Sequence, residues 1–594
     1  MKLSKVALLL SCALVLGTGV LYYPKWQQRG TEATLSWDVL GYYLYLPAVF
    51  IYGDVKQLAF RDKVLQRYQP TPDFQQAFRH ASGNYVIKYP AGQALLYSPF
   101  FFAGHFIAKK TKYYNDGFSY PYQMSIGVGM LLIACLGLWV LRKILLYYFS
   151  DAATALTLLV IAAATNYLNY AAIDGAMTHN TLFTLYAVLL WQTISFYKKP
   201  SVLRAAFIGL LAGLMALTRP TEILACLLFV GWGVAGWPDL KSRLRFFLHN
   251  LRYGVTFVLV LLAVGSIQLF YWKYVANEWV VYSYEEGFDW LHPHWWNSWF
   301  SAKGGWLLYS PVLLLIFPGF VMLYRQLPSI FWPALTFFLL FAYLCMAWQN
   351  WWYGGSLGIR AMVQAYPVLA FPLAAFFQQA TRWRYNLKMA IAGFLLLGVV
   401  YNLWLTHQAH KGGLLRPGEM TGAYLKAIFL RNRVPPETVL LLDNEQQQVT
   451  PPRQAQLVYE NNFDTNTTAA TAVFENNRRM YVSAGVQFTP EINFQFPFGT
   501  KGVLRASALF YAPQKEWNTW RMCQFIIKFY NGNAVVQSNM IRVFRLLQAG
   551  EEKRMYVDAR LPGERFDRVA VYLWNADSEA TVYMDDLRVY WLRY

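Results

Sequence analysis

Long apolar runs separated by short polar loops occupy the first two thirds of the chain. Each run has the length that a helix needs to cross the hydrocarbon core of a bilayer. We therefore predict a polytopic α-helical membrane protein with about eleven transmembrane helices. The expected spans cover residues 6–21, 122–141, 153–170, 180–197, 202–217, 222–237, 253–272, 306–323, 330–347, 362–379 and 388–405.

The first apolar run follows Lys2 and Lys5 and resembles a signal peptide in length. The residues after it, Tyr22-Tyr23-Pro24, do not offer the small-residue pair that a signal peptidase needs. We interpret residues 6–21 as an uncleaved first span with a cytoplasmic N-terminus.

One further apolar segment, residues 94–108, is short and contains Pro99 and Gly104. If this segment does not cross, most basic loops lie on the cytoplasmic side, as the positive-inside rule requires. Those loops contain Arg142, Lys143, Lys198, Lys199, Arg204, Lys241, Arg243, Arg245, Arg252, Arg325, Arg382, Arg384 and Lys388. We expect an interfacial helix here, within a long external loop at residues 23–120.

The pattern changes after the membrane domain, residues 1–406. An odd number of spans places the rest of the chain outside. Residues 407–451 contain Pro-Pro pairs and a glutamine run and are interpreted as a linker. Residues 452–594 show short alternating runs and the hairpin signal Asn531-Gly532. We expect an extracytoplasmic β-sandwich of the jelly-roll-like kind.

Composition supports a multi-pass protein of the inner (cytoplasmic) membrane of the cell. The 594 residues are 56% hydrophobic and 14% charged. The net charge of +20 comes from basic residues scattered through loops, so membrane lipid is the expected partner and nucleic acid is not. The five cysteines stand singly, which indicates neither a disulfide framework nor a zinc site.

Groups that could carry chemistry gather in the loops expected outside, whereas the cytoplasmic loops are short and basic. An acid just outside the first span, among aromatic residues, must be solvated or paired, so Asp38 is the first candidate. The candidate site residues are Asp38, Lys88, Asp174, His179, Arg219, Tyr353 and Arg360.

Several of these residues also have structural explanations. Asp38 and Asp174 can cap the helices that follow them, and Lys88 can extend its ammonium to the membrane interface. Arg360 can pair with a lipid phosphate or a loop carboxylate. The histidines of the external loops have no third ligand at a diagnostic spacing, so we expect no metal site.

Short motifs on the expected external side follow a definite order. They are Asp38 after the first span, Ile87-Lys88-Tyr89-Pro90-Ala91-Gly92, Gly213 to Pro220, Tyr309-Ser310-Pro311, and Trp352-Tyr353-Gly354-Gly355 through Arg360 to Pro367. In this order they resemble the GT-C superfamily of glycosyltransferases that use polyprenyl-phosphate sugars. The similarity is to the protein O-mannosyltransferase and lipid A aminoarabinose transferase branch, and it covers residues 1–405.

The resemblance implies transfer of a sugar from a polyprenyl-phosphate-linked donor to an acceptor hydroxyl or amine outside the cytoplasmic membrane. Asp38 matches the family's acceptor-side aspartate and would act as general base, with Asp174 as a second catalytic candidate. Lys88 and Arg360 would bind the donor phosphate. His179, Tyr353 and Arg219 are further candidates for lining the substrate, although Arg219 matches no defined role in the family. No essential cofactor is expected.

Other function classes remain open at this stage. A transporter or flippase of lipid-linked sugars would place ionisable residues near mid-membrane, whereas the apolar runs here are nearly free of charge. A membrane-anchored glycan-binding protein would need one span rather than about eleven. The sequence does not distinguish a glycan, a lipid or a protein as acceptor.

Overall fold

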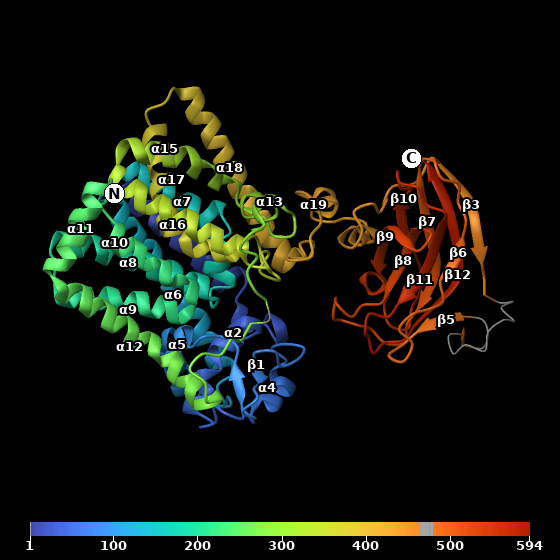
Figure 1. Ribbon diagram of the computed structural model, residues 1–594, viewed down its shortest axis with the longest axis horizontal. Helices are drawn as coiled ribbons and strands as arrows, with labels where there is room; N and C mark the ends of the chain where they lie inside the picture. Colours follow the sequence, from blue (N-terminus) through green and yellow to red (C-terminus); the bar gives the residue numbers. More distant parts are fainter. Residues whose placement is uncertain (1, 285, 464–473, 476–478, 594) are drawn as a thin grey trace. The chain divides into compact units, whose positions relative to one another are not determined.

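The computed structural model describes residues 2–284, 286–463, 474–475 and 479–593. The chain divides into two compact units, Met1–Gly418 and Glu419–Tyr594 (Figure 1). The first unit is helical and the second is built mainly from β-strands, so we describe each separately.

The first unit is a bundle of apolar helices. Each expected span contains a helix, and the helices concerned are α1 (Leu3–Leu16), α6 (Tyr120–Leu145), α7 (Asp151–Ala164), α8 (Thr178–Lys198), α9 (Val202–Thr218), α10 (Ala225–Gly231), α12 (Leu251–Ala276), α15 (Ile316–Gln326), α16 (Pro328–Ala347), α17 (Tyr366–Ala380) and α18 (Tyr385–His407). Further helices of this unit are α11 (Trp237–His249), α13 (Trp295–Phe300) and α14 (Trp306–Tyr309).

Six helical segments of the described chain are long and apolar enough to cross a membrane. They are Leu3–Gln27, Tyr120–Leu145, Leu251–Ala276, Pro328–Ala347, Arg360–Ala380 and Tyr385–Gly412. Four more apolar helices are shorter: Asp151–Ala164, Val202–Thr218, Pro220–Gly231 and Pro311–Gln326. These helices identify a multi-pass membrane protein, while the number of about eleven crossings and their direction stay predictions.

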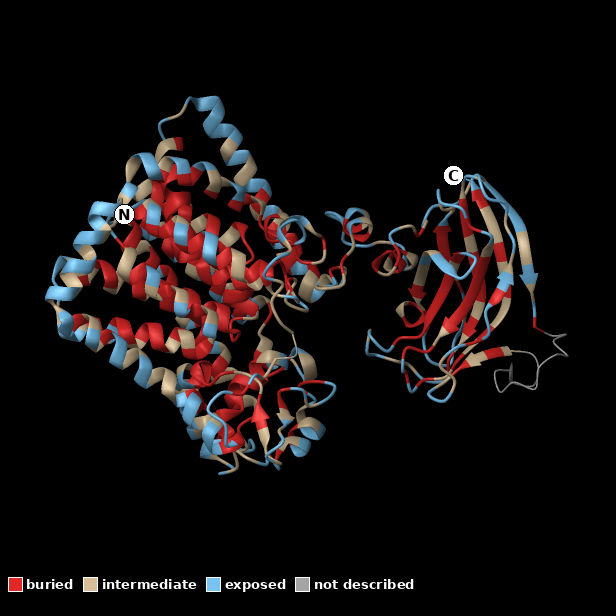
Figure 2. Cartoon of the chain, viewed as in Figure 1, coloured by how far each residue is buried: buried red, intermediate tan, exposed pale blue. Residues whose placement is uncertain are grey.

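Burial separates central helices from peripheral ones. The window at Arg360–Ala380 is 94% buried, whereas the windows at Leu251–Ala276 and Tyr385–Gly412 are 17% and 22% buried. Figure 2 shows mainly exposed and intermediate residues along α12 and α18. Gly319 of α15 packs so closely on α17 that a Cβ there would overlap the carbonyl oxygen of Pro372. Helix α17 is therefore central, and the apolar exposed faces of α12 and α18 suit contact with lipid.

The expected external loop folds as a small subdomain with its own apolar core. Its elements are α2 (Trp37–Tyr43), α3 (Tyr45–Phe50), α4 (Arg61–Tyr68), the antiparallel pair β1 (Ala77–Arg79) and β2 (Tyr85–Ile87), and α5 (Gly92–Lys109). Helix α5 covers the expected interfacial segment at residues 94–108. A Cβ on Gly92 would overlap the backbone of Thr218, so this glycine lets the start of α5 rest on the end of α9.

The second unit is a β-sandwich. Within the described residues, one sheet has the strand order β10-β7-β12-β5-β4, with β3 also paired to β12, and the other has the order β6-β11-β8-β9. The strands are β3 (Gln454–Asn461), β4 (Phe474–Glu475), β5 (Arg479–Val482), β6 (Ile492–Phe494), β7 (Val503–Tyr511), β8 (Gln524–Asn531), β9 (Ala534–Arg542), β10 (Glu552–Arg560), β11 (Arg568–Trp574) and β12 (Val582–Arg593).

Both sheets contribute to one core. The rings of Phe510 on β7 and Phe525 on β8 meet edge to face, with centroids 5.0 Å apart. Strands β8 and β9 form the expected hairpin, in which Asn531 pairs with Ala534 across a turn containing Gly532 at a φ of 59°.

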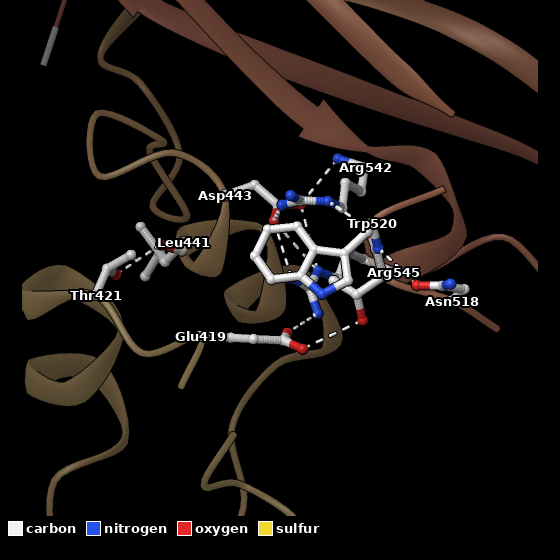
Figure 3. A network of polar contacts seen from close by, with 9 residues as sticks. Glu419, Thr421, Leu441, Asp443, Asn518, Trp520, Arg542 and Arg545 are labelled. Atoms are coloured by element: carbon white, nitrogen blue, oxygen red, sulfur yellow. Dashed lines mark hydrogen bonds and ion pairs between the residues drawn. The ribbon is translucent and has the colours of Figure 1, made fainter. Parts of the chain in front are cut away.

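The segment at residues 407–451, expected as a linker, contains regular structure that packs on the sandwich. It includes α19 (Gly422–Ile428) and a 3-10 helix at Pro436–Leu442, and Leu440 lies in the sandwich core. Asp443 is buried between Arg542 and Arg545, with Nη1 of Arg542 2.5 Å from its Oδ1 (Figure 3). The glutamine run also binds the sandwich: Nε2 of Gln447 donates to the carbonyl oxygen of Tyr556 at 2.8 Å, and its Oε1 accepts from the backbone N–H of Asp558 at 3.0 Å.

Candidate active site

Asp38 lies in the first turn of α2, and both of its carboxylate oxygens bind distant side chains. Oδ2 accepts a hydrogen bond from Nη2 of Arg360 at 2.6 Å, and Oδ1 accepts one from the Tyr89 hydroxyl at 2.8 Å. Helix α2 begins at Trp37, whose φ of 48° is rare for a residue with a side chain. This rare backbone conformation stands directly before Asp38, as such conformations often do at functional sites.

Arg360 begins the helical segment that leads into α17. Its backbone N–H donates to Oγ of Ser356 at 3.2 Å, which fixes the residue at the end of the loop before the helix. Its guanidinium is largely buried and pairs with Asp38, while its Nε is buried without a hydrogen-bond partner among the described residues. Part of the guanidinium is thus free to bind something else.

Three more cations point toward aromatic rings of the same region. The guanidinium carbon of Arg219 lies 5.9 Å from the ring centre of Tyr353, and Nζ of Lys88 lies 5.3 Å from that of Tyr284. Nζ of Lys303 lies 3.3 Å from the ring centre of Trp352. Aromatic faces attract cations without neutralising them, so the region keeps a positive charge.

Tyrosines connect these groups. The rings of Tyr42 and Tyr89 are 4.7 Å apart, and those of Tyr89 and Tyr284 are 6.3 Å apart. Burial, together with the neighbouring Asp38 carboxylate, raises the pKa of Tyr89 well above its ordinary value, so its hydroxyl remains a donor to Asp38. Tyr42 interacts electrostatically with Arg219, Asp38 and Arg360.

A second polar chain runs from this cluster into the bundle. Nδ1 of His179 lies 2.9 Å from Oε1 of Gln364, and Nε2 of Gln364 donates to Oε1 of Glu222 at 2.5 Å. The Tyr186 hydroxyl donates to Oε2 of Glu222 at 2.6 Å. His179 also interacts electrostatically with Arg219 and Arg360. The chain therefore adjoins the Asp38 cluster at His179.

Asp174 belongs to a different cluster. It forms an ion pair with Lys25 and accepts a hydrogen bond from Nδ2 of Asn169 at 2.9 Å, and Asn169 in turn contacts His410 at 2.6 Å. Burial alone would raise the pKa of Asp174, but the charges of Lys25 and His410 lower it to about 2. This carboxylate is fully engaged in joining the ends of helices.

The structure thus brings together Asp38, Lys88, Arg219, Tyr353 and Arg360, and it connects His179 to them. It places Asp174 among other partners. No group of three or more histidine, cysteine, aspartate or glutamate side chains within the described residues could hold a metal ion.

Other groups of the cluster were absent from the sequence-based candidates. Tyr89 stands next to Lys88 in the same motif and could have been named with it. Glu222 is an acid at the start of an apolar run, which is a recognised sign of function. Tyr42, Tyr284 and Gln364 carry no such sign, because their place depends on packing between distant segments.

Comparison with known proteins gave structural similarities only. No family model and no curated sequence matches. The chain is similar to the oligosaccharyltransferase AglB of Archaeoglobus fulgidus in complex with an inhibitory peptide and a dolichol-phosphate, with 11% identity, a TM-score of 0.37 and 72% of this chain covered. An oligosaccharyltransferase of Archaeoglobus fulgidus in the apo form gives 12% identity and a TM-score of 0.40 over 72% of this chain.

A third similar structure is the arabinosyltransferase EmbB of Mycobacterium smegmatis, with 10% identity and a TM-score of 0.38 over 99% of this chain. The matches span 57% of either oligosaccharyltransferase chain and 64% of the arabinosyltransferase chain.

Proposed function

We propose that this protein is a GT-C glycosyltransferase that moves a sugar from a polyprenyl-phosphate-linked donor to an acceptor outside the cytoplasmic membrane. The observation that carries the proposal is the ion pair between Asp38 and Arg360, surrounded by Lys88, Arg219 and buried tyrosines. This site combines one carboxylate that can take a proton with several cations that can hold a phosphate.

The cations suit the charge that develops during transfer. As the bond between the sugar C1 and the phosphate oxygen breaks, negative charge builds up on the departing polyprenyl phosphate. Arg360 offers a planar fork for phosphate oxygens, and Lys88 and Arg219 add positive charge. Such preorganised charges stabilise the transition state more strongly in a buried site than in water.

Asp38 is the proposed base. Without substrate, its charge is balanced by Arg360. A donor phosphate that binds Arg360 competes for that guanidinium and leaves the carboxylate available to the acceptor. The acceptor oxygen or nitrogen then attacks C1, Asp38 takes the acceptor's proton, and polyprenyl phosphate leaves with the bonding electron pair.

The test is turnover of a lipid donor by the purified protein. Undecaprenyl phosphate carrying mannose or aminoarabinose is supplied with glycan, lipid and peptide acceptors, and the products are weighed by mass spectrometry. We expect undecaprenyl phosphate to appear together with a glycosylated acceptor. Movement of the intact donor between bilayer leaflets, without its cleavage, would identify a flippase instead.

A further inference from the structure

Two buried polar atoms of the site lack partners. Nε2 of His179 and Nε of Arg360 are both buried and without a hydrogen-bond partner among the described residues. The whole His179 residue is 1% exposed, so water does not freely solvate it. Buried polar atoms in folded proteins are almost always paired with protein, ordered water or a ligand, so these two atoms are places where a bound molecule can pair.

Hydrogen bonds fix the amide of Gln364. Glu222 faces three donors: the Tyr186 hydroxyl at 2.6 Å, the Thr221 hydroxyl at 3.2 Å and Nε2 of Gln364 at 2.5 Å. Gln364 turns its nitrogen toward Glu222, an orientation in which all three groups donate to this side chain. Its oxygen then faces His179.

This orientation also fixes the proton on the imidazole. Oε1 of Gln364 accepts and cannot donate, so Nδ1 of His179, 2.9 Å away, must carry the hydrogen. The guanidinium groups of Arg219 and Arg360 interact electrostatically with the ring and repel a further positive charge on it. Nε2 of His179 is therefore an unprotonated acceptor.

The unpaired acceptor and donor lie in the same site. His179 interacts electrostatically with Arg219 and Arg360, and Tyr42 interacts with the same two arginines and with Asp38. The ring of Tyr170 packs against His179 with centroids 5.8 Å apart, and its hydroxyl lies 2.9 Å from Oγ of Ser356, the residue that anchors Arg360.

We propose that His179 and Arg360 bind a hydroxyl group of the donor sugar, an inference that rests on the proposed function. The hydroxyl donates to Nε2 of His179 and accepts from Nε of Arg360. A phosphodiester has no proton to give to Nε2, and an ammonium group cannot accept from Nε, so a hydroxyl fits both partners. Gln364 and Glu222 are positioning residues that hold the acceptor atom of His179 in place.

The test compares lipids with and without sugar. Equilibrium binding to the full-length protein is measured for undecaprenyl phosphate and for its mannosyl and aminoarabinosyl forms. The shorter amide of His179→Asn reaches Gln364 but not the place of Nε2. We expect this variant to bind the sugar-bearing lipids roughly 10-fold more weakly. Binding of undecaprenyl phosphate should stay unchanged.

Three variants make the comparison specific. His179→Gln, whose longer amide reaches the place of Nε2, should retain more of the affinity than His179→Asn. Glu222→Gln frees the amide of Gln364 and should weaken the binding of the sugar-bearing lipids only. His249 is exposed, so His249→Asn should leave the affinity for every lipid unchanged.

Several results would overturn the proposal. If His179→Asn weakens the binding of both kinds of lipid equally, or changes neither affinity, then the sugar hydroxyl does not bind at His179. A raised acceptor KM with unchanged donor binding would assign His179 to the acceptor. If the wild-type protein binds none of these lipids, the proposed function itself is overturned. Lys88→Ala tests that function separately, because it should weaken the binding of both kinds of lipid.

Discussion

Asp38 and Arg360 are separated by 322 positions, yet their side chains meet at 2.6 Å. Both could be named from the sequence, because each lies among aromatic residues in a loop that is expected outside the membrane. Their pairing could not, because it depends on how the loop before α5 packs against the start of α17. Asp174 resembles Asp38 in its sequence context, but its carboxylate binds Lys25 and Asn169 instead of an arginine of the candidate site. Partners, rather than residue type, separate the two acids.

The fork of Arg360 is expected to matter more than its charge. Arg360→Lys keeps a positive charge but removes Nε and the second nitrogen of the fork, so donor KM should rise roughly tenfold and kcat should fall. Steady-state kinetics with a lipid donor measure both. Exposed Arg382→Lys is the matched control. Unchanged kinetics in Arg360→Lys would mean that a point charge suffices.

Asp174 should act on stability. Its pKa of about 2 lies below the ordinary value of 3.8, so it stabilises the fold by about 2 kcal/mol above pH 4, and this contribution disappears as pH falls toward 2. Asp174→Asn should therefore lower the Tm in detergent at neutral pH, and the difference from wild type should shrink below pH 4. A constant difference across that range would contradict the ion-pair explanation.

At the scale of elements, apolar period and length predicted the helices well, because burial in a bilayer imposes both. Their breaks were less predictable: the span expected at 153–170 ends as α7 at Ala164, and a π-helix follows at Asn169–Ile173.

The ion pair between Asp38 and Arg360 supports the prediction that α5 does not cross the membrane. Eight expected spans, from residues 122–141 to 330–347, separate Asp38 from Arg360, and an even number returns the chain to one face. A crossing by α5 would make the number odd.

This topology predicts which side of the membrane each loop faces. Lys112 follows α5 in the expected external loop, and Lys199 follows α8 in an expected cytoplasmic loop; both are exposed. In intact cells, a membrane-impermeant thiol reagent should label Lys112→Cys but not Lys199→Cys, in a background without the native cysteines. Labelling of Lys199→Cys alone would mean that α5 crosses.

At the scale of the whole molecule, the sequence predicted a helical membrane part and a β-rich part, because their apolar periods differ. It set the start of the second part too late to include its buried polar contacts. Asp443 and Asn444 look like loop residues, yet Asp443 binds two arginines and Asn444 donates to the carbonyl oxygen of Asp558 at 2.7 Å. Such roles depend on strands that follow about a hundred residues later, beyond the reach of local patterns.

The stability of the second unit tests this boundary. A fragment 419–594 should unfold cooperatively, whereas a fragment 452–594 should be markedly less stable because it lacks Leu440 and Asp443. Asp443→Asn in the longer fragment should cost about 3 kcal/mol, since it leaves Arg542 and Arg545 without their buried partner. Denaturant unfolding measures all three. Equal stability of the two fragments would show that residues 419–451 are a linker after all.

Transfer by Asp38→Asn is the most direct test of the central claim, that Asp38 is the base of a glycosyl transfer. The change keeps the size of the side chain and removes its basicity, so single-turnover release of undecaprenyl phosphate should fall by roughly 10² to 10⁴-fold while donor binding persists. Exposed Asp73→Asn, in the same loop, should behave as wild type, and normal Tm values must accompany both. Wild-type turnover by a well-folded Asp38→Asn protein would contradict the account.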